Sequence, residues 1–324
     1  MKKASENCIV CGDKLVFAGI KPTVCDKGLC MFSHEQYGLG VHLDSFISQN
    51  PELADLFITM AVAATKGNNS KYSPFKPYPN GIQVVHKDKF TGKVTTHDFN
   101  RTGLTDNSKV KKVLDLLPTI KQMLKWINKD ILKEELDNIH PLAYSLVRWI
   151  IASNRCHLKK LDEKEQIKGM NTKFQYYLMS GTPKQEKVFQ DLKKKYGSVW
   201  AFHGSSLCNW HSIMRLGLKN MSGTSGQTNG AEYGSGVYLA NYAQTSFGYI
   251  RYQTGWNHTQ FGKGNLGCMA LCEIVKHPTI KNQPNPYYVI KDDKIIATRY
   301  FFIYDGKGSS SLKGKTLIPP KIKF

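Results

Sequence analysis

The residues most able to do chemistry are concentrated between positions 198 and 249. A short apolar and aromatic run, Val199 to Phe202, precedes His203-Gly204-Ser205, and this order predicts a strand that ends in a turn. Glycine at that turn lets a ligand approach the main chain closely. Apolar residues then recur at spacings of three and four from Leu207 to Leu218, with Gly217 as a stop signal, so we expect a helix after the turn.

A second group of polar and aromatic residues follows the stretch from Gly217 to Gly236, which is rich in Gly, Ser, Thr and Asn. Such a stretch is typical either of a mobile functional loop or of a simple linker. The next strand is predicted to contain Tyr238, and a helical turn beyond it would place Ser246 and Tyr249 on one face. Two aromatic rings and a hydroxyl group could therefore converge on one flat ligand.

Four of the eight cysteines lie close together near the N-terminus, as the pairs Cys8 and Cys11, and Cys25 and Cys30. This spacing suits two turns that hold one tetrahedral, structural zinc ion. Two disulfides, or free thiols packed in a core, are the alternatives, and His34 could replace one cysteine as a ligand. The other cysteines are scattered and are expected to lack chemistry: Cys156, Cys208, Cys268 and Cys272.

The order of these motifs carries a family resemblance. His203-Gly204-Ser205 is followed by Gly236-Val237-Tyr238, and then by Ser246 and Tyr249, eight and eleven residues after that tyrosine. This pattern resembles the catalytic core of the poly(ADP-ribose) polymerase (PARP) family of ADP-ribosyltransferases, and the likeness extends from about Pro141 to Asp305. The cysteine-rich N-terminus also resembles a mono-ADP-ribosyltransferase branch that carries such a cluster ahead of its catalytic domain.

The resemblance implies that the site binds NAD, with the nicotinamide ring held between Tyr238 and Tyr249. It also implies that the backbone of Gly204 and the hydroxyl group of Ser246 bind the nicotinamide amide. Aromatic rings and a few placed polar groups are what physical chemistry leads us to expect around a flat heteroaromatic ring. Without a ligand role, both tyrosines would be ordinary core aromatics.

His203 is implied by the same resemblance to hydrogen-bond the adenosine ribose, with Ser205 as a secondary contact. Without that role, His203 would be a strand-end histidine bonded to the backbone. Cleavage of NAD at the nicotinamide glycosidic bond leaves positive charge on the ribose. The site therefore needs rigid orientation and electrostatic support more than a strong base.

The third catalytic position departs from the polymer-forming members of the family. They carry a glutamate at the head of a late strand that ends in Tyr-Asp, and alignment on Tyr304-Asp305 puts Tyr300 in its place. A phenol, with an ordinary pKa of ~10, cannot accept a proton as a carboxylate does, although it can hydrogen-bond a ribose hydroxyl. Tyr300 therefore joins His203 and Tyr238 as a predicted catalytic residue, or else it is a plain strand aromatic. Glu273 is a candidate substitute base, or a surface residue.

The expected activity is transfer of a single ADP-ribose from NAD to a protein acceptor, self-modification included, with release of nicotinamide and no polymer. The competing hypothesis is a catalytically silent NAD-pocket protein, or a zinc-based adaptor for nucleic acid or protein. A conventional dehydrogenase finds no support, because no G-x-G-x-x-G motif follows a predicted strand.

The elements that would position this site predict an α+β fold, with an N-terminal four-cysteine zinc module, a helical region and a C-terminal sheet domain. The resemblance implies that this sheet domain has an ADP-ribosyltransferase-like split sheet, mixed or antiparallel. Leu53 to Ala64 predicts a buried helix, and residues 82–99 predict a hairpin. Residues 108–195 show a helical, lysine-rich pattern. Within them, residues 141–161 resemble the helix that packs beside the catalytic domain in the same branch.

The C-terminal part predicts a strand from Leu266 to Val275, and then a hairpin from residue 286 to residue 304 that turns at Lys291 to Lys294. The predicted domain organisation is a four-cysteine module over residues 1–45, a helical and hairpin accessory region over 46–140, and a catalytic domain over 141–324.

The chain has 324 residues and a net charge of +20, which allows one large or two modest domains and favours acidic partners. Only six of its basic residues are arginine and thirty-nine are lysine, so a solvated lysine-rich surface competes with nucleic-acid binding. The first residues contain no apolar signal segment, and the run from Leu53 to Ala64 is too short to cross a bilayer. We therefore expect an intracellular protein, cytoplasmic or nuclear, without a membrane span.

Overall fold

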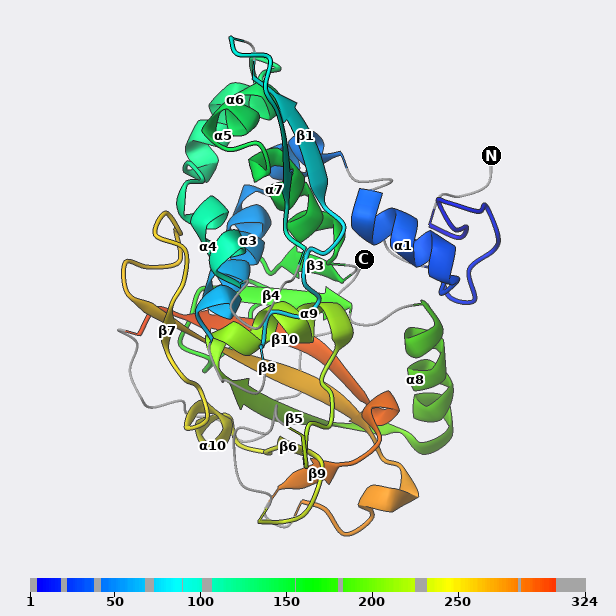
Figure 1. Cartoon of the computed structure of the whole chain (residues 1–324). Coiled ribbons are helices and arrows are strands. Elements are labelled where there is room, and N and C mark those ends of the chain that lie inside the picture. The colour runs from blue at the N-terminus through cyan, green and yellow to red at the C-terminus, as the bar shows by residue number, and fades with distance from the viewer. Residues whose placement is uncertain are drawn as a thin grey trace.

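The computed structural model describes residues 5–18, 22–37, 42–67, 73–88, 90–100, 107–154, 156–179, 183–224, 232–284 and 287–306. The helices that precede residue 153 gather on one side of a large antiparallel sheet, and the small sheet formed by residues 237–239 and 288–290 lies on the other side (Figure 1). Within these residues, no helix has both the length and the apolar character that crossing a membrane requires.

The N-terminal part of the described chain is mainly helical. Its helices are α1 (Gly28–Tyr37), α2 (Leu43–Gln49), α3 (Pro51–Lys66), α4 (Asn107–Asp115), α5 (Ile120–Ile127), α6 (Leu132–Ile139) and α7 (Ala143–Ala152). Every residue of α3 from Leu53 to Thr65 is buried, which confirms the predicted buried helix. A helix that is covered on all sides belongs to the interior of the protein.

A carboxylate inside α3 ties this helix to the C-terminal half. Asp55 is buried and accepts hydrogen bonds from the Thr59 hydroxyl at 3.0 Å and from the backbone N–H of Gln260 at 2.8 Å. Burial raises the pKa of Asp55, although these bonds act in the opposite direction. The polar partners explain how a charged residue is accommodated in an apolar helix.

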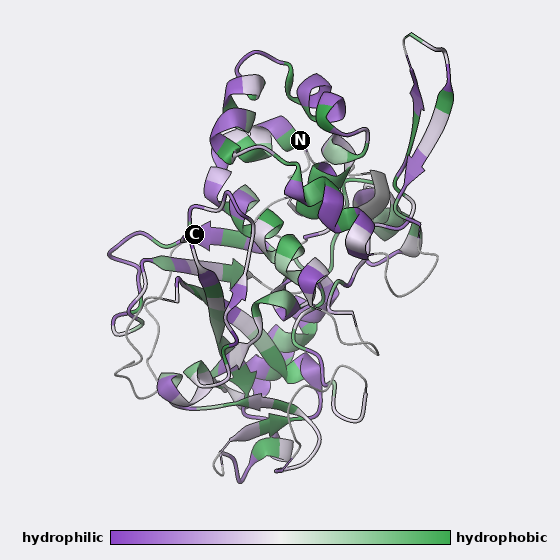
Figure 2. Cartoon of the chain, turned by 60° about the vertical axis from the view of Figure 1, so that its left-hand side comes forward, coloured by the Kyte–Doolittle hydropathy of each residue, from purple (hydrophilic) through white to green (hydrophobic). Residues whose placement is uncertain are grey.

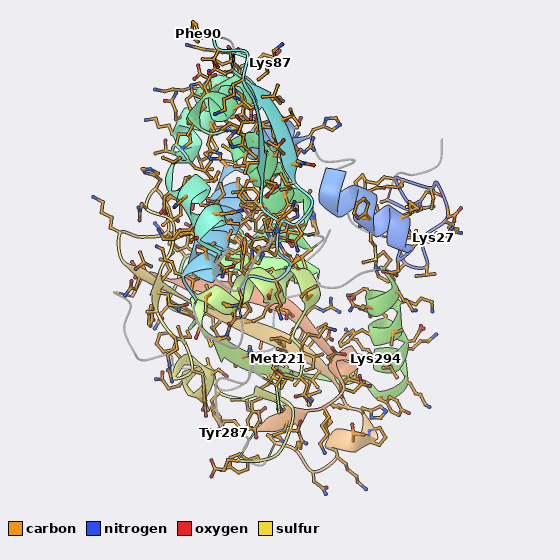
Figure 3. The ribbon with its side chains drawn as sticks, viewed as in Figure 1. Lys27, Lys87, Phe90, Met221, Tyr287 and Lys294 are labelled. Carbon is orange, nitrogen blue, oxygen red and sulfur yellow. The ribbon has the colours of Figure 1, made fainter. Side chains whose placement is uncertain are left out.

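The predicted hairpin is present as β1 (Gln83–Lys87) paired with β2 (Val94–Asp98). Its outer end stands away from the helices (Figure 2), whereas Val84 of β1 packs against a large hydrophobic core cluster. Phe90, labelled with Lys87 near the tip in Figure 3, is 99% exposed, so its side chain lies in solvent.

The large sheet has the strand order β3-β4-β10-β8-β5, with β7 paired to β8, and the small sheet consists of β6 and β9. All of these strand pairs are antiparallel, so the predicted sheet is antiparallel and not mixed. The strands are β3 (His157–Lys160), β4 (Phe174–Met179), β5 (Ser198–Ser205), β6 (Val237–Leu239), β7 (Gln253–Thr254), β8 (Asn265–Val275), β9 (Tyr288–Ile290) and β10 (Ile296–Tyr304). The helices are α8 (Pro183–Tyr196), α9 (Trp210–Leu216) and α10 (Ala243–Phe247), with 3-10 turns at Leu207–Asn209 (η1), Pro278–Ile280 (η2) and Asp293–Ile295 (η3).

The two faces of the large sheet support two hydrophobic clusters. Along β10, Phe301 and Ile303 join a main cluster that also contains α3, α7 and α9 residues. The alternate residues of β10, Tyr300 and Phe302 among them, belong to a smaller cluster on the other face. The main cluster is a single group of contacting residues whose members range from Leu43 to Ile303. The region before residue 140 and the sheet therefore share one core. The predicted boundaries at residues 45 and 140 stay predictions.

Three sequence predictions about secondary structure were wrong in part. The segment from 108 to 195 is not helical throughout, because β3 and β4 interrupt it and extend the large sheet through pairing with β10. The strands at 286–290 and 295–304 do not form a hairpin: β9 pairs with β6, and β10 enters the large sheet. The turn expected at residue 203 does not occur, since β5 continues through Ser205. In each case, pairing with a strand distant in sequence decides the outcome, and local patterns do not report it.

Candidate active site

A cavity of about 550 Å³ opens between the end of β5, helix α9, strand β6 and the segment before β9. His203, Gly204, Ser205, Tyr238, Ser246 and Tyr249 all line it, so the structure brings these predicted site residues together. Residues 225–231, inside the glycine-rich stretch, lie outside the described chain, but Met221 and Glu232 on either side of them also line the cavity.

His203 is held by a single backbone contact. Its Nδ1 lies 2.9 Å from the carbonyl oxygen of Tyr238, which can only accept, so Nδ1 carries the proton in the neutral ring. Burial lowers the pKa of His203, and the bond to that carbonyl offsets only part of the effect. The imidazole is therefore neutral near pH 7, and Nε2 is left as a hydrogen-bond acceptor.

Gly204 lies where the backbone of α10 crosses β5. A Cβ atom on Gly204 would be 1.9 Å from the carbonyl oxygen of Ser246, so no side chain fits. The Ser246 hydroxyl donates to the carbonyl of Phe202 at 2.8 Å, and Ser246 itself is buried. The hydroxyl oxygen keeps lone pairs that can accept from a ligand amide.

Alanine at position 204 is expected to abolish nicotinamide binding and to cost about 1–3 kcal/mol of unfolding free energy, because α10 must move away from β5. Calorimetric titration with nicotinamide and thermal unfolding measure the two effects. Gly264→Ala is the matched control, since the nearest atom to its Cβ would be the Asp305 carbonyl oxygen at 3.9 Å. A Gly204→Ala protein that binds nicotinamide as tightly as the control would contradict this assignment.

Tyrosine side chains form one wall of the cavity. The Tyr238 hydroxyl donates to the Gly234 carbonyl at 2.8 Å and accepts from the backbone N–H of Tyr233 at 3.0 Å. Tyr287, labelled in Figure 3, places its ring centroid 6.0 Å from that of Tyr238 and 6.5 Å from that of Tyr249. Its hydroxyl lies 3.4 Å from the Tyr249 hydroxyl, and this contact together with burial raises the pKa of Tyr249 to about 12. The Tyr249 phenol is therefore neutral at physiological pH.

The comparisons with known proteins agree with this geometry. Residues 165–309 match the poly(ADP-ribose) polymerase catalytic domain. The chain carries a PARP catalytic domain. The four cavity motifs that suggested the resemblance, from His203 to Tyr249, all lie inside the matched residues.

Two named mono-ADP-ribosyltransferases are similar to the chain. The proteins called mono-ADP-ribosyltransferase PARP8 from Mus musculus and Homo sapiens are each 32% identical to it over 329 residues, which cover 93% of this chain and 37% of those proteins. Homo sapiens PARP16, also named a protein mono-ADP-ribosyltransferase, is 27% identical over 215 residues, which cover 55% of this chain and 64% of that protein. The chain thus spans little more than a third of the length of its PARP8 relatives, and their likeness includes the accessory region as well as the PARP domain.

Tyr300 is not among the residues that line the cavity of the PARP domain. Tyr300 is 2% exposed. Its ring packs edge-on against that of Tyr177, with centroids 5.2 Å apart, and lies tilted to the ring of Trp200, with centroids 5.9 Å apart. Burial raises the pKa of Tyr300 well above its ordinary value. The structure therefore separates Tyr300 from His203 and Tyr238, and its catalytic role stays a prediction.

Glu273 is neither a surface residue nor a residue of the cavity. It is buried, accepts from Ser198 at 2.7 Å, and forms ion pairs with Lys193 at 2.6 Å and with Arg299 at 3.3 Å. Its role is to complete a charged cluster between β8 and β10. Among the described residues, Glu232 is the carboxylate that lines the cavity, and no sequence pattern predicted it, because it lies in the glycine-rich stretch.

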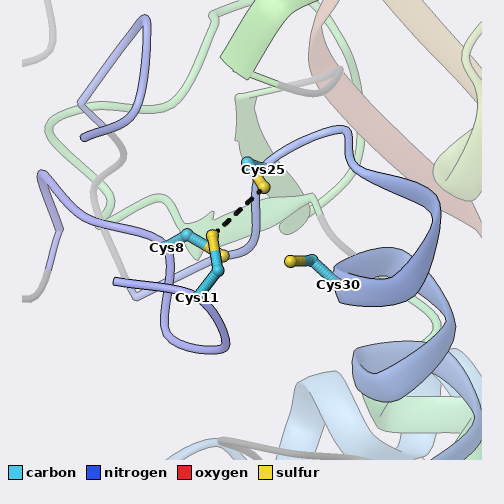
Figure 4. A group of neighbouring side chains, drawn as sticks. All are labelled: Cys8, Cys11, Cys25 and Cys30. Atoms are coloured by element: carbon cyan, nitrogen blue, oxygen red, sulfur yellow. Dashed lines mark hydrogen bonds between the residues drawn. The ribbon is translucent and has the colours of Figure 1, made fainter. Parts of the chain in front are cut away.

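The four predicted metal ligands are close together in space. The sulfur atoms of Cys8, Cys11, Cys25 and Cys30 all lie within 4.8 Å of one another, with those of Cys11 and Cys25 3.8 Å apart (Figure 4). Burial opposes ionisation of Cys8, but hydrogen bonds from backbone groups of Cys11, Cys25 and Val10 lower its pKa to about 6. The group could hold a metal ion. The remaining cysteines are buried, as expected of core residues.

Proposed function

We propose that this chain is an NAD-dependent mono-ADP-ribosyltransferase, which transfers one ADP-ribose from NAD to a protein acceptor, itself included, and releases nicotinamide. The observation that carries the proposal is the convergence of His203, Gly204, Tyr238, Ser246 and Tyr249 on one cavity within a PARP catalytic domain. The names of the similar proteins, all mono-ADP-ribosyltransferases, support it.

The nicotinamide amide would bind to the backbone of Gly204 and to the Ser246 hydroxyl oxygen, with the ring beside Tyr238 and Tyr249. His203 Nε2, as an acceptor, would take a hydrogen bond from a ribose hydroxyl. The bond between the nicotinamide nitrogen and ribose C1′ breaks, its electron pair leaves with nicotinamide, and the acceptor attacks the oxocarbenium-like carbon and releases its proton. Fixed polar groups around the separating charges supply most of the rate enhancement.

The residue at position 300 leads us to propose that a single ADP-ribose is transferred and that no polymer forms. No carboxylate occupies it, and the phenol there is buried with a raised pKa, so it is a poor base for activating a ribose hydroxyl of a growing chain. Incubation with radiolabelled NAD followed by gel electrophoresis tests this. A sharp labelled band is expected, whereas a high-mass smear would contradict single transfer.

A catalytically silent NAD-binding protein, or a zinc-based adaptor for nucleic acid or protein, is the second candidate, and the burial of Tyr300 away from the cavity favours it. It predicts NAD binding without release of nicotinamide. Binding to nucleic acid would have to fall steeply with salt and survive His203→Ala. A cytoplasmic or nuclear location stays a prediction under either function.

The cysteine group is proposed to bind structural zinc. Four sulfurs each ~2.3 Å from a tetrahedral zinc ion lie ~3.8 Å from one another, which agrees with the distance between Cys11 and Cys25. A disulfide would require a sulfur–sulfur distance of only ~2.05 Å. Bound zinc would hold the chain around Cys8 and Cys25 against the start of α1, which carries Cys30.

Purified protein is expected to contain about one zinc per chain, and Cys25→Ala is expected to lose nearly all of it, because three thiolates do not close a structural site. Elemental analysis provides the measurement. Cys208→Ser, outside the group, should retain the metal. Zinc-free wild-type protein with disulfides detected by mass spectrometry would reverse the assignment.

A further inference from the structure

The hairpin of β1 and β2 has one face that is both apolar and basic. Val94 lies opposite Lys87 in the pairing register, and Val85 precedes Lys87 by two residues. Residues that lie opposite one another, or two apart in one strand, share a face of the ribbon, so these three side chains lie on one face. Val85 is 65% exposed and Val94 is 61% exposed. Because Val84 on the other face packs against the core, the face with Val85 is turned away from the body of the protein.

The turn that joins the two strands is held by one carboxylate. The Asp88 side chain accepts hydrogen bonds from the backbone N–H of Phe90 at 3.0 Å, and from the backbone N–H and the hydroxyl of Thr91 at 2.6 and 2.8 Å. These bonds, with those from Thr91 foremost, lower the pKa of Asp88. The backbone N–H of Gly92 donates to the Asp88 carbonyl at 3.0 Å. The acidic group is thus engaged within the turn, and the Phe90 ring lies in solvent at the tip.

Lysines flank this exposed ring. Lys87 ends β1, Lys93 lies one residue before β2, and both side chains are exposed. The stretch 87–93 contains three lysines and one aspartate, so its net charge is +2, and residues 83–98 contain no arginine. Lysine acts as a hydrated point charge, whereas arginine is the usual reader of single phosphates and bases. The composition of the tip therefore favours a diffuse anionic surface over a specific anion.

The tip is far from the cavity. In Figure 3, the labelled Phe90 and Lys87 lie at the opposite end of the molecule from Met221 and Tyr287, which line the cavity. A partner that binds the tip therefore leaves the cavity open to solutes.

The small size of the tip decides between anionic partners. A specific protein partner usually buries about 1,000 Å² or more, which a two-stranded tip does not supply. Single-stranded nucleic acid is held by several stacked rings, and Phe90 is the one aromatic residue in 87–93. A membrane requires neither, because one ring can enter the boundary between head groups and acyl chains while lysines stay among the head groups.

We propose that the tip of the β1–β2 hairpin docks on an anionic membrane surface, with Phe90 among the lipids and with Lys87 and Lys93 among acidic head groups. Val85 and Val94 extend the apolar contact along the same face. One ring and a few lysines give weak, reversible attachment. This inference is independent of the proposed transferase function, since no residue of the cavity takes part.

Sedimentation of the full chain with lipid vesicles tests the proposal. Wild-type protein is expected to bind vesicles of phosphatidylcholine and phosphatidylserine, to bind phosphatidylcholine alone much more weakly, and to be released by added salt. Phe90→Ala should weaken binding to the mixed vesicles about tenfold, as for loss of one inserted ring, and Phe90→Trp should retain it. Replacing both Lys87 and Lys93 by glutamine should weaken it about 30-fold, from about fivefold per lysine.

The controls make the same changes elsewhere on the surface. Phe32→Ala alters a residue that is 51% exposed on α1, and the double replacement of Lys164 and Lys168 by glutamine removes equal charge between β3 and β4. Both controls should bind the mixed vesicles like the wild type. Thermal unfolding midpoints of all variants should match the wild type, because the replaced side chains are exposed.

Wild-type protein that does not sediment with the mixed vesicles would overturn the proposal. Equal losses in the hairpin and control variants would also overturn it, because binding would then follow overall charge. If Phe90→Ala loses affinity for a single-stranded oligonucleotide and keeps vesicle binding, the tip is a nucleic-acid site instead. Nicotinamide release from NAD should be equal in Phe90→Ala and wild type, so the transferase function is tested separately.

Discussion

Replacing His203 by alanine is expected to lower kcat/KM for NAD by about 10²- to 10³-fold, as observed when one fixed polar group is removed from an active site. The change removes the Nε2 acceptor from the cavity. It also removes the 2.9 Å contact between Nδ1 and the Tyr238 carbonyl, which joins β5 to β6. Initial rates of nicotinamide release from NAD measure the loss.

His258→Ala is the matched control, because His258 is exposed and lies outside the cavity. It should release nicotinamide at the wild-type rate. Thermal unfolding of both variants separates loss of chemistry from loss of fold. If the kcat/KM of His203→Ala for NAD stays within a few-fold of the wild-type value, His203 has no important role in catalysis.

Arg299→Met is expected to cost about 3–5 kcal/mol of unfolding free energy, the range seen when one partner of a buried ion pair is removed. The guanidinium of Arg299 donates to both carboxylate oxygens of Glu186, at 2.8 and 3.0 Å, and to Glu273 at 3.3 Å. All three side chains are 4% exposed, so removal of the arginine leaves two carboxylates buried near each other. Denaturant unfolding provides the measurement.

Lys193→Met serves as the control for the same cluster. Lys193 also pairs with Glu273, but its side chain is 40% exposed, so its removal should cost at most about 1 kcal/mol. Should Arg299→Met fail to fold, Arg299→Lys, which keeps the charge but loses the two-pronged contact, should show an intermediate loss. Equal denaturation midpoints for Arg299→Lys and wild type would show that this geometry contributes nothing.

Local sequence patterns predicted one group of cavity residues because these residues are separated by short spacings in the chain. His203 and Gly204 are adjacent on β5, and Ser246 and Tyr249 are three residues apart at α10. The placement of each pair therefore depends on the correct prediction of only one secondary-structure element. Glycine at position 204 was interpretable because only a residue without Cβ permits such close approach. The cysteine group was equally predictable, since the two members of each pair are close together in the sequence.

The remainder of the site depends on contacts between distant segments. Tyr287 reaches the cavity because β9 pairs with β6, some fifty residues earlier in the chain, and the sequence suggested a different partner for β9. Lys76 lies at the cavity because main-chain carbonyls of its segment accept hydrogen bonds from Ser212 of α9. The order of side chains in the sequence does not predict such main-chain contacts. Such pairings are decided by packing of the whole chain and not by local propensity.

For Tyr300, the position in the alignment predicted the strand but not the residues that surround the side chain. The motif that ends in Tyr304-Asp305 gives its register, and β10 is indeed a strand there. The register alone could not reveal that Tyr177 and Trp200 surround the ring. The alternative considered from the sequence, a plain strand aromatic, agrees with this packing, so a direct role in catalysis would require the ring to leave its cluster.

Intact-mass spectrometry of the full chain after incubation with NAD tests the central claim most directly. Wild-type protein, or an added acceptor protein, is expected to gain mass in discrete steps of one ADP-ribose, and these steps should disappear in His203→Ala. Unchanged masses for protein and acceptor, despite calorimetric evidence that NAD binds, would contradict the transferase function and favour a silent NAD-binding protein.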